Sequence, residues 1–254
     1  ISYPYHTFPI RNCGTVSDNL AVGYDGAALA CGISFSIGPG ECVLLCGANG
    51  IGKSTLLKTM AGLCGPVGGT CRFEPDNAGH HLVMVPPKIP KVPGFTVEEF
   101  IAAGCFRETG WFGHVPLKIR KRIGEAVDRM GIQSLSGRDI SSLSDGEFQK
   151  VTIASALAQR ADIILLDEPT AFLDVDSRES VLSVLQNLVS QGNVSVVFSS
   201  HDIVSASRCC NRVFGMLRSE SGIVFNDSGG GASADVIRET IEGCFTSFRG
   251  FSCS

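Results

Sequence analysis

The chain has 254 residues, 44% of them hydrophobic, and a formal net charge of -4 at pH 7. A chain of this length can bury a complete core as one compact domain, and its negative charge argues against nucleic acid as a partner. Its eleven cysteines are scattered along the sequence, which is typical of reduced thiols rather than of a disulfide framework. No apolar run reaches the roughly 20 residues that cross a bilayer, so we expect any membrane contact to be made through a partner.

Short apolar alternations interrupted by glycine turns fill the region from Asn19 to Glu41. They predict antiparallel strands in an N-terminal β layer. Apolar runs of strand length follow at 42–46, 81–85, 163–167, 194–199 and 212–217, with helical patterns between them. Strands that alternate with helices in this way predict an α/β fold with a mainly parallel central sheet.

The stretch between His81 and Asp139 has the strongest helical pattern. Thr96 and Glu99 predict a capping box at the start of one helix, and Gly131 predicts the end of another. The apolar face of that second helix carries Ile119, Ile123, Val127 and Met130. Beyond residue 226 the sequence loosens into glycines and then a short amphipathic segment with Ile237, Ile241 and Phe245.

The segment 47–54, Gly-Ala-Asn-Gly-Ile-Gly-Lys-Ser, follows an apolar run and opens a helical pattern. It matches the P-loop in its strand, loop and helix context, so we expect a P-loop nucleoside triphosphatase fold that binds ATP. Lys53 would bridge the β- and γ-phosphates, and the Ser54 hydroxyl would hold Mg²⁺. The residues expected to bind ATP here are Gly47, Asn49, Gly50, Gly52, Lys53, Ser54 and Thr55.

Polar residues at the ends of two strand-length apolar runs complete the expected catalytic site. Asp167 and Glu168 end one run, and His201 follows another. At the carboxyl edge of a parallel sheet, Asp167 would reach Mg²⁺ through water and Glu168 would act as the general base for the attacking water. His201 would contact the γ-phosphate. Taken alone, an acidic pair after a strand also fits a polar loop start or a helix cap.

The segment 143–147, Leu-Ser-Asp-Gly-Glu, opens a helical pattern shortly before the acidic pair. Read in isolation, Ser144 and Glu147 form a capping box. The order of P-loop, this segment, the acidic pair, the segment 171–174 and His201 resembles the ATP-binding cassette family over roughly residues 19–217.

The resemblance implies that two copies of the chain pair head to tail. The signature residues Ser144, Asp145, Gly146 and Glu147 of one copy would then face the nucleotide held by Lys53 of the other, and Asp174 would belong to the D-loop. It also implies that Tyr24 stacks on adenine, although a tyrosine in a turn or core is the alternative. The implied subdivision of a single domain over 1–254 is a RecA-like core with the β layer at about 12–80 and 160–226, a helical subdomain at about 88–158 and a tail at 227–254.

One position departs from the family pattern: Pro87 stands where a glutamine is usual. Proline has neither an amide side chain nor a backbone N–H, which puts the metal contact and the coupling to a partner in doubt there. A nucleotide-gated module with little turnover is therefore one alternative reading.

The segment 106–113 resembles the cassettes of bacterial importers for iron siderophores, haem and cobalamin. The resemblance implies an ATP-hydrolysing subunit on the cytoplasmic face of the bacterial inner membrane that powers uptake of an iron chelate. Its partners would be a transmembrane permease and, indirectly, a solute-binding protein. Trp111 and Phe112 would be ordinary packing residues or part of a groove for a permease helix. The alternatives are a transporter for another solute and a soluble cassette ATPase of the iron-sulfur assembly type.

Overall fold

The computed structural model describes residues 14–74, 81–108, 115–192, 194–220 and 222–246. Six strands form a central sheet in the order β5-β6-β7-β3-β8-β9, in which only the edge pair β8–β9 is antiparallel. The predicted α/β fold with a mainly parallel sheet is confirmed. The strands of this sheet are β3 (Cys42–Gly47), β5 (His81–Val85), β6 (Ala161–Leu166), β7 (Ser195–Ser199), β8 (Arg212–Ser219) and β9 (Gly222–Asp227).

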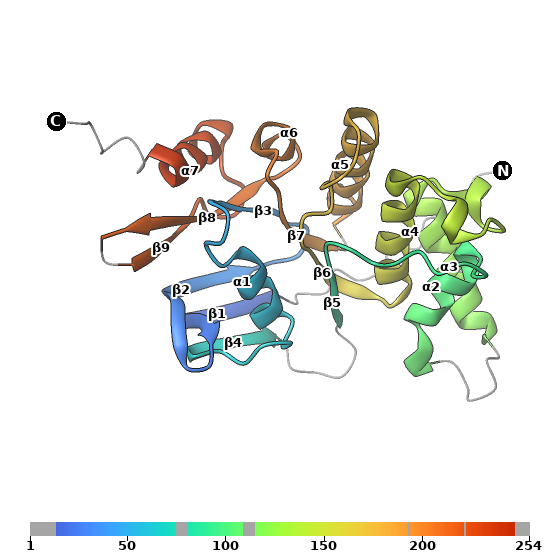
Figure 1. The fold of residues 1–254 in the computed structure, drawn as a ribbon, viewed down its shortest axis with the longest axis horizontal. Helices are drawn as coiled ribbons and strands as arrows, with labels where there is room; N and C mark the ends of the chain where they lie inside the picture. The colour runs from blue at the N-terminus through green and yellow to red at the C-terminus, as the bar shows by residue number, and fades with distance from the viewer. Residues whose placement is uncertain (1–13, 75–80, 109–114, 193, 221, 247–254) are drawn as a thin grey trace.

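A second, antiparallel sheet has the order β2-β1-β4 and lies below the central sheet in Figure 1. Its strands are β1 (Gly14–Tyr24), β2 (Ala27–Ile37) and β4 (Gly68–Glu74). The N-terminal β layer is thus confirmed, although β1 begins before Asn19. Strand β4 was not predicted from the sequence, because its residues show no clear alternation of apolar and polar side chains.

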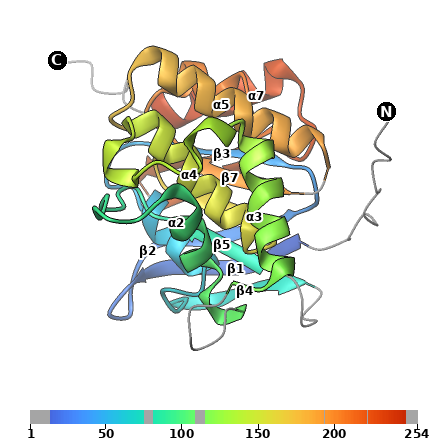
Figure 2. The ribbon, with the colours of Figure 1, turned by 90° about the vertical axis from the view of Figure 1, so that its right-hand side faces the viewer.

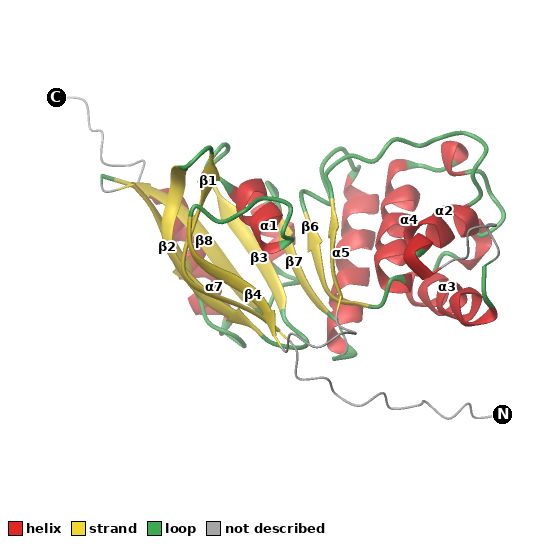
Figure 3. Cartoon of the chain, turned by 90° about the horizontal axis from the view of Figure 1, so that it is seen from below, coloured by secondary structure: helices red, strands yellow, loops and turns green. Residues whose placement is uncertain are grey.

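The central sheet is covered on both faces, which explains why its inner strands β3, β6 and β7 are buried along almost their whole length. In β3, alternate side chains enter different cores: Leu44 and Cys46 pack on one face, while Val43 and Leu45 pack on the other. The second face is covered by α1 (Lys53–Met60) and the antiparallel sheet, as Figure 3 shows. Complete burial of a valine or leucine side chain contributes about 1.5–3 kcal/mol.

The first face is covered by α5 (Val175–Ser190), α6 (Ile203–Ser207) and α7 (Ala234–Thr246). The amphipathic segment predicted near the C-terminus is therefore helix α7, which packs on β8 and β3 through buried Ile237. Residues 247–254 of the expected tail lie outside the described residues.

A helical subdomain packs at the β5 end of the central sheet and faces the viewer in Figure 2. It comprises α2 (Val97–Gly104), α3 (Leu117–Met130) and α4 (Asp145–Ala158). The predicted apolar face of α3 is buried, and Gly131 ends this helix with a φ of 64°. The predicted capping box of Thr96 and Glu99 is present at the start of α2. Trp111 and Phe112 lie outside the described residues.

Candidate functional site

The loop between β3 and α1 has a backbone shape that depends on glycine. Gly47, Gly50 and Gly52 have φ values of 147°, 70° and 108°, which side chains rarely tolerate. A Cβ on Gly47 would also lie 2.4 Å from the carbonyl oxygen of Met216 on β8. Because these glycines have no side chains, the loop backbone can approach a ligand closely at the N-terminus of α1. There the free N–H groups and the helix dipole favour an anion.

Lys53 is the first residue of α1, and only 6% of its surface is exposed. Its Nζ donates to the carbonyl oxygens of Gly47 at 2.9 Å and of Ala48 at 3.1 Å. Burial lowers the pKa of Lys53, while the charges of Glu168, Cys46 and Asp167 oppose this shift. A phosphate group fits this loop, because it would give a partly desolvated ammonium an anionic partner that carbonyl oxygens do not supply.

Asp167 and Glu168 follow β6, two strands away from the P-loop in the same sheet. The Asp167 side chain is 3% exposed and its Oδ1 accepts from the hydroxyl of Ser199 at 2.9 Å. The same hydroxyl accepts from the backbone N–H of Glu168 at 2.8 Å. Ser199, the last residue of β7, therefore fixes both acidic residues at the sheet edge. This serine was not predicted from the sequence, because nothing in its local pattern distinguishes it from other strand residues.

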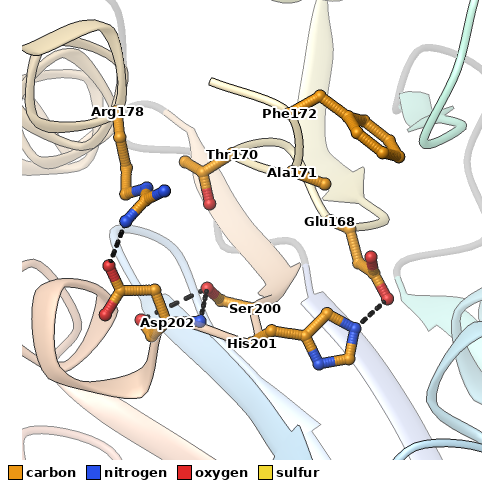
Figure 4. A pocket seen from close by; sticks show the side chains of 8 residues that line it. All are labelled: Glu168, Thr170, Ala171, Phe172, Arg178, Ser200, His201 and Asp202. Atoms are coloured by element: carbon orange, nitrogen blue, oxygen red, sulfur yellow. Dashed lines mark hydrogen bonds and ion pairs between the residues drawn. The ribbon is translucent and has the colours of Figure 1, made fainter. Parts of the chain in front are cut away.

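Glu168 and His201 meet at the carboxyl edge of β6 and β7. The Glu168 Oε1 lies 2.6 Å from the His201 Nε2, as Figure 4 shows. Glu168 has a φ of 53°, an uncommon value for a residue with a side chain, which indicates a constrained backbone at this point. The structure thus brings together the two residues that the sequence places at this edge.

The hollow that this pair lines is also lined by Arg178 of α5, a second residue not predicted from the sequence. Its Nη1 lies 2.7 Å from the Oδ2 of Asp202, and its Nη2 donates to the carbonyl oxygen of Leu173 at 3.2 Å. A hydrogen bond from the Ser205 N–H lowers the pKa of Asp202 and keeps it charged for this pairing. Arg178 therefore connects the segment 171–174 to the residue that follows His201.

The signature residues form the first turn of α4. Ser144 and Glu147 exchange hydrogen bonds of 3.2 and 2.8 Å, which confirms the predicted capping box. Lys91 of the segment after β5 lies 2.6 Å from the Oδ1 of Asp145 and donates to the carbonyl oxygen of Leu143 at 2.8 Å. The signature turn is thus fixed from inside its own helix and from this segment.

The structure does not place the signature residues at the P-loop of the same chain. Figure 3 shows α4 apart from α1, with β6 and α5 between them. Ser144 and Asp145 are exposed, whereas Gly146 packs against Ser177 of α5. The signature turn and the P-loop of one chain are therefore separate parts of the fold.

The remaining predicted residues lie at the borders of the site. Tyr24 ends β1, is 47% exposed, and its hydroxyl accepts from Thr55 Oγ1 at 3.2 Å. Asn49 is exposed in the P-loop. Asp174 caps α5 by accepting from the Ser177 N–H at 2.8 Å. Pro87 is exposed just after β5.

Comparison with known proteins gives a consistent result. The sequence profile of the family described as ABC transporter matches residues 31–171. The chain is 35% identical over 190 residues to a probable metal transport system ATP-binding protein of Chlamydia pneumoniae, which covers 73% of each chain. It is 31% identical over 200 residues to a probable siderophore transport system ATP-binding protein of Bacillus subtilis, which covers 76% of this chain and 73% of that one.

A solved structure of an inward-facing metal-chelate type ABC transporter is also similar. The TM-score is 0.74 at 27% sequence identity, over 85% of this chain and 84% of the other. Within the described residues, no helix has the length and apolar character needed to cross a membrane. The family profile, the relatives and the P-loop at the sheet edge all support the same conclusion. The chain belongs to the ABC transporter family and is an ATP hydrolase of that family.

Proposed function

We propose that this chain hydrolyses ATP at the edge formed by β3, β6 and β7 and thereby powers a membrane importer. The observation that carries this proposal is the placement of Lys53, Asp167 and the Glu168–His201 pair at one sheet edge. In the proposed roles, Lys53 holds the β- and γ-phosphates in the glycine loop, while stacking on Tyr24 positions adenine. Ser54 and Asp167 would hold Mg²⁺, which when bound neutralises developing phosphate charge.

Glu168 is proposed to orient the attacking water and to accept its proton. A carboxylate at the carboxyl edge of the sheet, with its backbone fixed by Ser199, is suited to this task. Its hydrogen bond with His201 limits the positions of the carboxylate, and in the proposed complex the imidazole would contact the γ-phosphate. Lys53, Glu168 and His201 are therefore the proposed catalytic residues.

We further propose that two copies of the chain act together. Ser144 and Asp145 are exposed at the start of α4, away from their own P-loop, so the signature turn formed by Ser144, Asp145, Gly146 and Glu147 could face ATP held by a second copy. The helix N-terminus would add a favourable dipole toward the γ-phosphate. Asp174 and the segment around it would lie at the contact between the copies. Closure around ATP and release after hydrolysis would then alternate the conformation of the permease.

The proposed cargo is an iron chelate, such as a siderophore or haem. The support for this cargo is that relatives carry names that refer to metal, siderophore and cobalamin transport. The solute would contact the permease and a solute-binding protein rather than this chain. The proposed location is the cytoplasmic face of the bacterial inner membrane, where the chain is peripheral and held by the permease.

The test is co-expression of the chain with the genes that neighbour its own, followed by purification of the membrane fraction in detergent. We expect a multi-span permease to co-purify and ATP hydrolysis to rise when a solute-binding protein loaded with ferric chelate is added. Replacing the ferric chelate with cobalamin or a free metal ion tests the cargo separately. Recovery of soluble partners alone would reject the importer and favour an assembly ATPase.

A further inference from the structure

Two thiols from distant parts of the chain meet directly behind the P-loop. Cys46 precedes Gly47 at the end of β3, and Cys244 lies in the last turns of α7. Their sulfur atoms are 3.6 Å apart, and the two side chains are 0% and 5% exposed. Cys46 donates to Cys244, which in turn donates to the carbonyl oxygen of Thr240 at 3.1 Å.

The fold makes a specific space for this contact. Gly215 of β8 is paired with Cys46 in the parallel ladder, and a Cβ on Gly215 would lie 2.4 Å from the Cys244 sulfur. The absence of a side chain at Gly215 therefore lets the Cys244 thiol sit over β8 beside Cys46. Ile237, which belongs to α7 like Cys244, is buried and packs this helix on the sheet.

We propose that Cys46 and Cys244 form a redox-active pair, which a peroxide closes to a disulfide that slows ATP hydrolysis. In the first step, the Cys244 thiolate attacks one peroxide oxygen, which gives a sulfenic acid and water. In the second step, the Cys46 sulfur displaces the hydroxyl group of the sulfenic acid as a second water. Two thiols and one hydrogen peroxide thus give one disulfide and two water molecules, with two electrons passing from sulfur to oxygen.

The environment of the thiols determines which one reacts first. The hydrogen bond from Cys46 lowers the pKa of Cys244 and outweighs the effect of burial. That hydrogen bond and burial both raise the pKa of Cys46. Cys244 is therefore the attacking thiol and Cys46 the resolving thiol. Helix ends open more readily than core strands, which gives a small oxidant access to Cys244 before it reaches Cys46.

Disulfide formation would act on the P-loop because the two sulfur atoms must approach to about 2.05 Å from their separation of 3.6 Å. The residue after Cys46 is Gly47, whose carbonyl oxygen accepts from Lys53 and whose backbone packs tightly on Met216. A displacement at Cys46 would therefore change the position of Lys53. Reduction of the disulfide by a thiol would restore the original arrangement.

In the test, the purified full chain is treated with hydrogen peroxide and its remaining free thiols are then blocked. Cross-linked peptides are mapped by mass spectrometry, and the ATPase rate of the same sample is measured. We expect a link between Cys46 and Cys244, with the ATPase rate lowered about tenfold, since displacements of about 1 Å at an active site can cost more than that. Dithiothreitol should remove the link and restore the rate.

Two variants separate this pair from general thiol oxidation. Cys244→Ser should keep the basal ATPase rate and lose its sensitivity to peroxide. Cys71→Ser is the matched control: Cys71 is partly buried in β4, where burial raises its pKa to about 11, and this variant should stay sensitive. Peptide mapping of the wild-type chain needs neither variant to fold. Absence of the link, or a link that leaves the ATPase rate unchanged, would overturn the proposal.

Discussion

Ser199 contacts both acidic residues of the sheet edge through a single hydroxyl group. Ser199→Ala would remove one of the partners of the buried Asp167 carboxylate and the acceptor of the Glu168 N–H. Loss of such a partner costs about 1–3 kcal/mol of stability. Substitution of a residue that orients a metal ligand typically lowers metal affinity or activity by about 10- to 100-fold. We therefore expect Ser199→Ala to lower kcat by about 10- to 100-fold and to raise the Mg²⁺ concentration required for activity. Steady-state ATP hydrolysis at varied Mg²⁺ measures both.

Ser195 provides the matched control at the other end of β7. It is also buried, and its hydroxyl donates to the Gly38 carbonyl at 2.7 Å and accepts from the Glu41 N–H at 3.3 Å. Ser195→Ala should lower stability to a similar extent and leave the Mg²⁺ requirement unchanged. Equal effects of the two substitutions on the Mg²⁺ requirement would show that Ser199 has only a structural role.

At the scale of elements, the packing of α4 on α5 depends on Gly146. A Cβ at this position would lie 2.7 Å from both Cβ and Oγ of Ser177. Gly146→Ala should therefore destabilise the chain by about 1–3 kcal/mol, the usual effect of overpacking. Gly124→Ala is the control, because a Cβ there meets no atom within 4 Å and alanine favours the interior of α3 by about 0.5–1 kcal/mol. Thermal unfolding should shift in opposite directions, and a shift in the same direction would contradict the packing argument.

Arg212 connects strands of both sheets. Its buried guanidinium pairs with Asp227 of β9 and with Glu41 before β3, and it donates to the carbonyl oxygen of Ser36 on β2. Arg212→Met would leave the two carboxylates without their cation, and breaking such a pair costs about 3–5 kcal/mol. Urea unfolding measures the loss.

The control for this substitution is Arg238→Met. Arg238 makes an ion pair with Asp235 on the exposed surface of α7, and such a pair contributes about 0–1 kcal/mol. We expect a change within this range. A comparable loss of stability in both variants would mean that burial does not determine the contribution of Arg212.

The features that could be predicted from the sequence are those determined by residues close together along the chain. The P-loop, the capping boxes and the end of α3 at Gly131 each depend on residues within a few positions of one another. The contacts made by Ser199 and Arg178 were not predictable, because they join residues on different elements. The same holds for Cys46 and Cys244, which lie 198 positions apart. Hydrophobic periodicity indicates which face of a helix or strand is apolar, but it does not identify the side chain on another element that this face contacts.

At the scale of the whole molecule, acid stability follows from carboxylates at the starts of helical segments. Hydrogen bonds lower the pKa of five of these groups, from backbone N–H groups in four cases and chiefly from the Ser141 hydroxyl in the case of Asp139. The other four are Glu99, Glu147, Asp174 and Asp202. Lowered values mean that the unfolded chain binds more protons than the folded chain as the pH falls through the ordinary pKa values near about 4.

The stabilisation from these groups is therefore fully present above about pH 5 and is lost progressively below about pH 4. The free energy of unfolding, measured in urea between pH 7 and pH 3, should decrease at the acid end. Glu99→Gln should weaken this dependence, because it removes one titrating cap while keeping a side chain that can accept a hydrogen bond. A free energy of unfolding that rises below pH 4 would contradict the contribution assigned to the caps.

The central claim is that Glu168 drives ATP hydrolysis at this sheet edge, and the most direct measurement compares steady-state ATPase rates of the wild-type chain and Glu168→Gln in the same permease complex. General base catalysis typically contributes about 10²- to 10⁴-fold, so we expect a loss of at least about 100-fold with ATP binding retained. Glu179→Gln, a change at an exposed position of α5, should keep the wild-type rate. Equal rates for the wild-type chain and Glu168→Gln would contradict the account.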